Sequence, residues 1–476
     1  MDTRQRWLAL YVLCLGSLMI VLDATIVNVA LPSIREDLGF SETSLAWVVN
    51  AYLLTYGGLL LLGGRLGDLY GHRRLFIYGI TLFTLSSLAC GLSGSQGFLV
   101  AARAVQGVGG AVASAVSLSL IMILFTAVAE RTKAMGFFGF VASGGGTLGV
   151  LLGGVLTDAL SWHWIFLVNV PIGAAVCVLC LRLLPRDEAA GGGRIDVPGA
   201  VAITGALMVA VYAIVNGNEN GWTSFETLGL LALAVVLLVA FLVIESRVSE
   251  PLVPLRLFRL RNVATANAVG VLWAAAMFAW FFLAALYLQL VLGYSALEVG
   301  LGFAPSTIIM GAFSLGLSAR LVMRYGYRPP LAVGLTLAAC GLLLFARAPV
   351  DGTYVVDVLP SMVLLGFGAG MAFNPVLMAA MNDVEPNEAG LASGVVNTSF
   401  MMGGALGLAV LASVAASRTD SLRESGESAL QATTGGYHTS FLIGALFALT
   451  AAALGSALLR SGRPAEVHGE PEPVRA

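Results

Sequence analysis

An acidic side chain, Asp23, interrupts the first long apolar stretch of the chain, Leu8–Leu31. A charge at membrane depth costs about 2.5–3.5 kcal/mol on insertion scales, so a residue of this kind usually has a function. A buried carboxyl group can take up a proton at ordinary pH and release it when a cation or another ligand arrives. Asp23 therefore has the chemistry of a proton-coupling group. The alternative is that it lies near the outer interface, bonds Asn28 or a backbone amide, and only fixes helix packing.

Arg103 is the second charge well inside an apolar segment, Phe98–Leu124. Gln106 follows it by three residues, so the two side chains share one face of a helix and can point into one polar cavity. Arg103 could pair with Asp23, favour the ionised form of another acid, or bind an anionic group. A static ion pair that does not change during any reaction cycle is the alternative.

The composition places most of the chain in lipid. Of 476 residues, 58% are hydrophobic and only 11% are charged, whereas soluble domains carry about 25% charged residues. This excludes a soluble enzyme, a nucleic-acid-binding protein and a disordered chain. The five cysteines, including Cys177 and Cys180 of a CxxC, lie in apolar runs, and the four histidines are far apart. We therefore expect no metal site and no cofactor.

Fourteen apolar segments are long enough to cross a membrane as helices, which takes about 20 residues each. The sequence predicts an all-α polytopic membrane protein whose spans are Leu8–Leu31, Leu45–Gly63, Leu75–Ser93, Phe98–Leu124, Met135–Thr157, Ile165–Leu184, Pro198–Val215, Thr227–Ile244, Val263–Leu290, Val299–Leu317, Leu331–Phe345, Val355–Met378, Gly390–Ala415 and Ser440–Leu459.

The basic residues predict the orientation of these spans. With the N-terminus inside, about twenty basic residues fall in inner segments, since positive charge collects on the cytoplasmic side. The outer segments then hold only Arg35, Arg347, Arg418 and Arg423. Both termini are therefore predicted to be cytoplasmic. The longest outer loop, about Ser417–His438, is polar and is predicted to be mobile.

A short repeat suggests two duplicated halves. The pattern R-L-x-x-x-Y-G-x-R occurs at residues 65–73 and again at residues 320–328, each time after the second helix of a six-helix group. Internal repeats around a midplane site are typical of secondary transporters. The predicted parts are an N-terminal six-helix bundle (1–184), two inserted linker helices with cytoplasmic loops (185–262), a C-terminal six-helix bundle (263–460) and a disordered cytoplasmic tail (461–476).

Glycines recur at small-xxx-small spacing in the fifth span, which lets membrane helices pack closely. The residues are Gly145, Gly149, Gly153 and Gly154. Static packing and a sliding interface between moving helices predict the same pattern, so the sequence leaves both open.

At the level of motifs the chain resembles the major facilitator superfamily, and within it the fourteen-span drug/proton antiporters. The resemblance covers nearly the whole length and rests on six strings: LDATIVNVALPSI, GGRLGDLYGHRR, RAVQGVGGA, GGTLGVLLGG, WHWIFLVNVPIG and NEAGLASGVVNTSFMMGGALG. The chain departs from the family pattern in three places. Val150 replaces the usual proline of the antiporter motif, His163 replaces an arginine, and Asn50 stands where some relatives carry an acid.

The resemblance implies roles for further residues. It links Arg103 to proton transfer. It also implies a gating loop whose Asp68 carboxylate contacts the start of span 13, near Gly390, where a helix N-terminus favours an anion. The complete loop set is Gly64, Gly67, Asp68, Gly71, Arg73 and Arg74.

Polar and aromatic residues at plausible membrane depth are candidates for a substrate cavity that would suit a large, amphipathic and mostly uncharged ligand. They are Asn28, Asn50, Tyr52, Gln106, Trp273, Trp280, Gln289, Asn374 and Asn397. The alternative for any aromatic residue among them is that it faces lipid.

The predicted function is proton-coupled export of hydrophobic or amphipathic small molecules, such as drugs and antibiotics, by alternating access. Uptake by symport remains an alternative, as do a membrane-embedded enzyme without transport activity and a passive receptor or channel. The predicted partners are a small-molecule substrate, protons and the lipid bilayer, without nucleic acid, and the predicted state is a monomer. Because every basic residue except Lys133 is an arginine, a habit of GC-rich coding, we expect a multi-pass protein of a bacterial inner (plasma) membrane.

Overall fold

The computed structural model describes residues 3–184, 196–382, 384 and 388–459. These residues are almost entirely helical, and no strand occurs among them. In hydrocarbon every backbone N–H and C=O group must be paired within its own segment, so apolar runs of this length fold as helices. The predicted all-α membrane fold is confirmed.

The helices follow one another with short connections. In chain order they are α1 (Thr3–Leu38), α2 (Glu42–Tyr70), α3 (His72–Gly91), α4 (Gln96–Leu124), α5 (Val128–Ala159), α6 (Trp164–Leu167), α7 (Asn169–Leu183), α8 (Val197–Asn220), α9 (Phe225–Arg247), η1 (Leu255–Arg259), α10 (Arg261–Leu286), η2 (Tyr287–Val291), α11 (Ala296–Ala312), η3 (Phe313–Leu317), α12 (Ser318–Tyr325), α13 (Arg328–Phe345), η4 (Tyr354–Val358), α14 (Leu359–Asn382), α15 (Ala389–Glu424) and α16 (Ala429–Leu458).

The number of spans is consistent with fourteen. Within the described ranges, twelve helices are long and apolar enough to cross a membrane, and α5 and α11 contribute two shorter apolar stretches, Gly145–Ala159 and Ala296–Ala312. The helix that starts at Ala296 is interrupted by the π-helical turn η3, where Gly316 has a φ of 120°. The chain is a multi-pass membrane protein.

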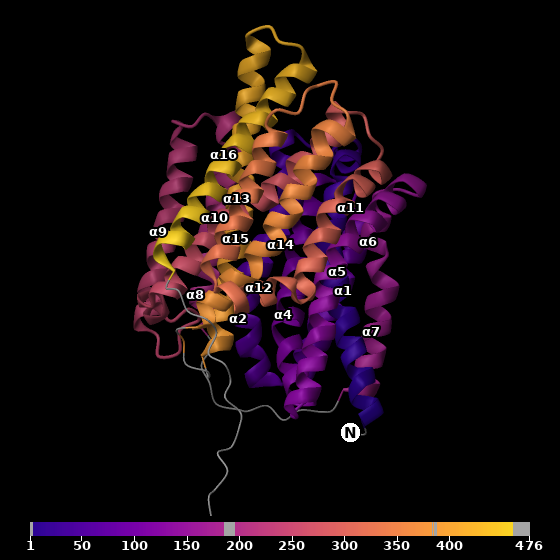
Figure 1. Cartoon of the computed structure of the whole chain (residues 1–476), viewed down its shortest axis with the longest axis vertical. Helices are drawn as coiled ribbons and strands as arrows, with labels where there is room; N and C mark the ends of the chain where they lie inside the picture. Colours follow the sequence, from indigo (N-terminus) through magenta and orange to yellow (C-terminus); the bar gives the residue numbers. More distant parts are fainter. Residues whose placement is uncertain (1–2, 185–195, 383, 385–387, 460–476) are drawn as a thin grey trace, which may run out of the picture.

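The helices pack in two groups with a hairpin beside them. Helices α1 to α7 contact one another, as do α10 to α16, and the groups meet where α2 packs on α15 and α5 packs on α11. The hairpin of α8 and α9 lies along one side of the bundle (Figure 1). Helix α8 contacts both α2 and α15, so it covers the seam between the two groups. We call these groups the N-terminal and C-terminal halves.

The first and the last described helix have their free ends at the same end of the molecule. Helix α1 begins at the lower end in Figure 1, and α16 runs from the upper end toward it. Helix α16 ends beside the starts of α10 and α13: Arg261 donates to the carbonyl of Ala457 at 3.2 Å, and Arg328 donates to that of Leu459. An even number of spans requires this arrangement. Following the predicted orientation, we call this end inner and the opposite end outer.

The prediction of an outer loop at Ser417–His438 is wrong. Helix α15 continues to Glu424 and α16 already begins at Ala429, so a helical hairpin projects from the outer end. The hydroxyl of Ser428 accepts a hydrogen bond from the backbone N–H of Gln431 at 3.3 Å and caps α16. Such a cap, with helix-forming residues on both sides, outweighs the polar composition. The predicted tail (461–476) and residues 185–195 of the predicted linker lie outside the described residues.

Both copies of the loop repeat turn at a glycine with a positive φ. Gly71 joins α2 to α3 with a φ of 94°, and Gly326 joins α12 to α13 with a φ of 76°. Both values lie in the left-handed region that glycine adopts without steric cost. This agreement supports the interpretation of the loops as duplicates.

Candidate functional site

The two charges singled out by the sequence form an ion pair inside the N-terminal half. Nη1 of Arg103 on α4 donates to Oδ2 of Asp23 on α1 at 2.5 Å, and both residues are 0% exposed. Nη1 also donates to Oε1 of Gln106 at 2.8 Å, and Nε donates to the backbone oxygen of Val48 at 3.0 Å. A buried charge is tolerated only when it is paired and hydrogen-bonded, and this pair meets both conditions.

Two amides complete the surroundings of the carboxylate. Oδ1 of Asp23 accepts from Nε2 of Gln106 at 2.8 Å and from Nδ2 of Asn169 at 3.0 Å. Asn169, the first residue of α7, also donates to the hydroxyl of Ser87 on α3 at 3.0 Å. In every described hydrogen bond of Asp23 the partner is therefore the donor. An ionised carboxylate only accepts hydrogen bonds, so these partners suit it. We call Asp23, Arg103, Gln106 and Asn169 the coupling cluster.

Two aromatic rings lie against the guanidinium group of Arg103 in the coupling cluster. The guanidinium carbon of Arg103 lies 4.4 Å from the centre of the Tyr52 ring and 5.6 Å from that of Phe166. Stacking of this kind favours a cation by about 2 kcal/mol when it is desolvated. The Tyr52 hydroxyl and both polar atoms of the Asn50 side chain are buried and make no hydrogen bond within the described residues. The structure thus brings Tyr52 to the cluster but gives Asn50 no polar partner there.

Two predicted cavity residues meet in the C-terminal half. Trp273 of α10 and Asn397 of α15 line a cavity of about 10 Å³, together with Phe400. This volume holds roughly one water molecule, so a drug-sized ligand would require the walls to separate. Trp280, seven residues further along α10, packs instead against Phe281 with 4.4 Å between ring centres.

The remaining predicted cavity residues lie apart from these two groups. Asn28 donates to the carbonyls of Ala24 and Thr25 in its own helix rather than to Asp23. Asn374 is half-buried in α14. Gln289 joins the halves, because its Nε2 donates to the backbone oxygen of Val29 at 2.8 Å.

A second contact between the halves lies at the outer end. Asp158, near the end of α5, accepts hydrogen bonds from the backbone N–H groups of Ala296 and Leu297 at 3.1 and 3.0 Å. These groups belong to the first turn of α11, where the helix dipole favours an anion. The sequence reasoning did not single out Asp158. Beside it, a Cβ atom on Gly154 would lie 2.8 Å from the Ala296 oxygen, so the two helices touch through backbone.

Comparison with known proteins identifies the family of this chain. Residues 13–408 match the family model described as Major Facilitator Superfamily. The chain belongs to this superfamily. It is 40% identical to the cephamycin export protein CmcT of Amycolatopsis lactamdurans over 97% of this chain and 95% of that protein. It is 41% identical to the puromycin resistance protein pur8 of Streptomyces alboniger, over 87% and 83% of the two chains.

The fold agrees with that of a transporter whose structure has been solved. The crystal structure of an auto-inhibited peptide transporter of the POT family superposes with a TM-score of 0.68, over 95% of this chain and 96% of that one. At 15% identity this likeness shows the fold alone. As a member of the superfamily, the chain binds small-molecule substrates within a membrane.

The predicted gating loop lies at the inner end of this superfamily member. The Asp68 side chain is 56% exposed, and its Oδ1 lies 3.2 Å from Nε2 of His72. Nη2 of Arg73 donates to the carbonyl of Leu181 at 2.7 Å, Arg74 is exposed, and a Cβ atom on Gly64 would meet open space. The side chains at the start of span 13 are outside the described ones, so the contact of Asp68 with this helix start stays a prediction.

The glycines of α5 form its contact with α1. A Cβ atom on Gly145 would lie 3.0 Å from Val21, and one on Gly153 would lie 2.8 Å from the Ile26 oxygen. At Gly149 it would lie 2.8 Å from the Leu22 oxygen. Static packing and a sliding interface both fit this geometry. Across the described residues, no three His, Cys, Asp or Glu side chains are grouped as metal ligands.

Proposed function

We propose that this superfamily member exports hydrophobic or amphipathic small molecules in exchange for protons, by alternating access between its two halves. The observation that carries the proposal is the coupling cluster, in which a fully buried Asp23–Arg103 pair is held by Gln106 and Asn169. Ionisable side chains inside a membrane bundle are characteristic of ion pathways and proton relays. The functions for which these relatives are named, cephamycin export and puromycin resistance, favour drugs as substrates and export as the direction.

Protonation of Asp23 is the proposed first step. A proton on Oδ2 removes the negative charge that faces Arg103, and the guanidinium then keeps its bonds to Gln106 and to the Val48 carbonyl. Without this charge, α1 is held less strongly to α4 and α7. Release of the proton to the inner side restores the pair, so each cycle alternates between a bound and a loosened α1.

In this proposal, the protonation of Asp23 affects the outer end of the molecule through contacts between helices. Helix α1 packs on α5 through the glycines of α5, and α5 carries Asp158, which binds the first turn of α11 in the other half. A shift of α1 against α5 therefore acts on a contact between the halves. Opening of that contact exposes the midplane to the outside, while its closure permits access from the inside.

The substrate is proposed to bind near the small cavity of the C-terminal half. Trp273, Phe400 and Asn397 offer two aromatic surfaces and one amide, without a charge. Such a lining selects ligands by shape and apolar area, with one directed hydrogen bond. We further propose that the protein works as a monomer in a bacterial plasma membrane, and that the Asp68 loop stabilises the closed inner end in one of the two states.

A transport assay in inside-out membrane vesicles tests the proposal. With an acidified lumen, the native protein is expected to accumulate puromycin or a lipophilic fluorescent dye, and an uncoupler should abolish the accumulation. Asp23→Asn should lose gradient-driven accumulation but still bind the ligand. Glu36→Gln is the control, because Glu36 is an exposed acid at the outer end of the same helix and makes no hydrogen bond within the described residues. Full gradient-driven transport by Asp23→Asn would exclude Asp23 as the coupling group.

Uptake by symport is the second candidate, and one observation favours it. Val150 stands in α5 where the antiporter motif has a proline, and it is 1% exposed against the contact with α11. A symporter would accumulate the ligand in right-side-out vesicles with an acidic exterior. Export predicts accumulation only in the inside-out preparation, so the sidedness of the vesicles separates the two functions.

A further inference from the structure

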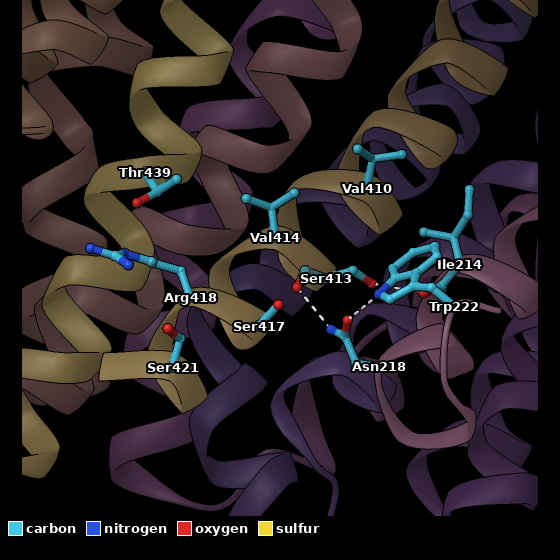
Figure 2. Close-up of a pocket in the computed structure, with 10 residues that line it drawn as sticks. All are labelled: Ile214, Asn218, Trp222, Val410, Ser413, Val414, Ser417, Arg418, Ser421 and Thr439. Atoms are coloured by element: carbon cyan, nitrogen blue, oxygen red, sulfur yellow. Dashed lines mark hydrogen bonds between the residues drawn. The ribbon is translucent and has the colours of Figure 1, made fainter. Parts of the chain in front are cut away.

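A cavity of about 590 Å³ lies near the outer end of the molecule, between α8, α15 and α16 (Figure 2). We call it the α8–α15 pocket. Its volume falls within the range of about 300–1,000 Å³ that small-molecule sites occupy. It lies between the inserted hairpin and the C-terminal half, not at the contacts where the two halves meet. The coupling cluster and the Trp273 cavity are lined by other residues.

The lining of the pocket has its one charged residue on one side and apolar side chains on the other, where Asn218 and Trp222 are already hydrogen-bonded to each other. In Figure 2, Arg418, Ser421 and Thr439 lie on one side, and Ile214 and Val410 lie on the other. Side chains of this kind match an amphiphile, whose charged head meets the polar side while its apolar body covers the other. The sign of the charge follows from Arg418, since a guanidinium is always cationic.

Arg418 is available for an anion. Within the described part of the chain it makes no hydrogen bond or ion pair, although it is one of only four basic residues in the predicted outer segments. Glu427 lines a neighbouring cavity that Arg418 also borders, but no ion pair joins the two within the described residues. A guanidinium binds the oxygens of a phosphate in a bidentate manner. The Ser421 hydroxyl also lines the pocket and makes no hydrogen bond within the described residues, so it is a further donor, whereas the Thr439 hydroxyl donates to the Gly435 carbonyl at 3.0 Å.

The wall of the pocket is already ordered. Nδ2 of Asn218 donates to the backbone oxygen of Ser413 at 2.8 Å, and the Ser413 hydroxyl donates to that of Ile214 at 2.9 Å. Nε1 of Trp222 donates to Oδ1 of Asn218 at 2.9 Å. These bonds tie α8 to α15 across the floor of the pocket. A ligand therefore needs little rearrangement of the wall, which lowers the cost of binding.

We propose that the α8–α15 pocket binds one anionic phospholipid of the outer leaflet. Its phosphate lies against Arg418 and the Ser421 hydroxyl, and an acyl chain lies along Ile214, Val410 and Val414. The pocket borders the lipid-facing side of the molecule, because α8, which supplies Ile214 and Asn218 to its wall, is an apolar candidate span with only 39% of its apolar window buried. Trp222 stands at the outer end of α8, at the level where indole rings collect in membrane proteins. The inference is independent of the proposed export.

Native mass spectrometry of the full-length purified protein tests the inference. The protein in detergent is titrated with phosphatidylglycerol, which is anionic, and with phosphatidylcholine, which has no net charge. The native chain is expected to retain one phosphatidylglycerol with preference over phosphatidylcholine. Arg418→Gln should weaken this binding about tenfold, equivalent to about 1.4 kcal/mol. Arg423→Gln should leave it unchanged, because Arg423 is an exposed arginine of the same helix that does not line the pocket.

A second variant and two competitors test the apolar part. Val414→Trp fills the pocket while it keeps Arg418, and it should also lose the lipid. Glycerol phosphate alone should not bind at the lipid concentrations used, because it lacks the acyl chains. Equal retention by native protein and Arg418→Gln, or equal binding of glycerol phosphate, would overturn the proposal. Displacement of the lipid by the transported dye would assign the pocket to the transport path and would also overturn it. Gel filtration checks that each variant is folded.

Discussion

At the scale of single residues, the coupling cluster depends on both members of the ion pair. Removal of one partner from a buried pair costs about 3–5 kcal/mol, because the other charge is left without compensation. Asp23 and Arg103 are both 0% exposed, so neither can be hydrated where it lies. Protonation of Asp23 also removes its negative charge, but reversibly. Arg103 then keeps its contacts with Gln106, the Val48 carbonyl and the Tyr52 ring. The proposed cycle uses this energy difference.

Asn169 gives a prediction at this scale. Asn169→Ala removes a donor from the Asp23 carboxylate, and an interaction with a charged group contributes about 1.5–3 kcal/mol. We expect the free energy of unfolding to fall by about this amount and proton-driven transport to decline with it. Denaturant unfolding of the purified protein and the vesicle assay measure the two effects. Asn28→Ala is the control, because the Asn28 amide bonds only carbonyls of its own helix. Equal stability of the two variants would contradict the prediction.

The residues of the cluster were only partly predictable from the sequence. Asp23 and Arg103 stand out because a charge in an apolar run is costly, and Gln106 follows from helix periodicity. Asn169 belongs to the quoted string WHWIFLVNVPIG, and a lone amide in such a run was a usable signal. Asp158 lies near a helix end, where an acid is ordinary. Its partners are backbone groups of a helix 138 residues away, and no local pattern indicates that contact.

At the scale of helices, the contact between α1 and α5 has no room for side-chain atoms at two glycines, Gly149 and Gly153. A Cβ atom on Gly149 would lie 2.8 Å from the Leu22 carbonyl and 2.1 Å from the Thr25 hydroxyl. The carbonyl belongs to the backbone and cannot turn aside, so the two helices would have to separate. Gly146, on the same helix, would meet only the Thr25 methyl group at 3.9 Å, which is ordinary van der Waals contact.

Gly149 and Gly146 form a matched pair of variants. Gly149→Ala should destabilise the protein by about 1–3 kcal/mol, the usual cost of overpacking. Gly146→Ala should be neutral or should stabilise by up to about 1 kcal/mol, since alanine favours a helix. The Tm in detergent and the transport rate of each variant measure these effects. If Gly149→Ala has the native Tm but transports slowly, the contact serves sliding rather than static packing. A native Tm and a native rate together would exclude both roles.

The helices themselves were well predicted because the bilayer imposes their length and their hydrogen bonding. The segment whose structure was predicted wrongly lies outside the predicted membrane spans. The hairpin between α15 and α16 extends beyond the predicted spans. Its residues are polar, and a prediction from hydropathy assigns polar residues between two spans to a loop. Its cap at Ser428 is a local signal that the composition of the segment conceals.

At the scale of the whole molecule, two hydrogen-bonded contacts among the described residues join the halves toward their outer ends. One is the bond from Gln289 to the Val29 carbonyl, and the other is the Asp158 carboxylate on the first turn of α11. An alternating-access cycle requires both to break when the outer side opens. The Asp158 contact stabilises the closed form by the dipole and by two charge-assisted hydrogen bonds. It therefore sets part of the equilibrium between the two states.

Asp158→Ala should shift this equilibrium toward an open outer end. A loss of about 1.4 kcal/mol changes the ratio of two states about tenfold. Spin labels at Leu160 and Leu301, which are 57% and 55% exposed, report the separation of the outer ends of α5 and α11. In a background without the native cysteines, electron–electron distance measurements should show a larger population of the long distance in the variant. Glu298→Ala is the control, because Glu298 caps α11 from within the same half. This control variant weakens the start of α11 without removing a bond between the halves. If it shifts the distance distribution as much as Asp158→Ala does, fraying of α11, and not separation of the halves, opens the outer end.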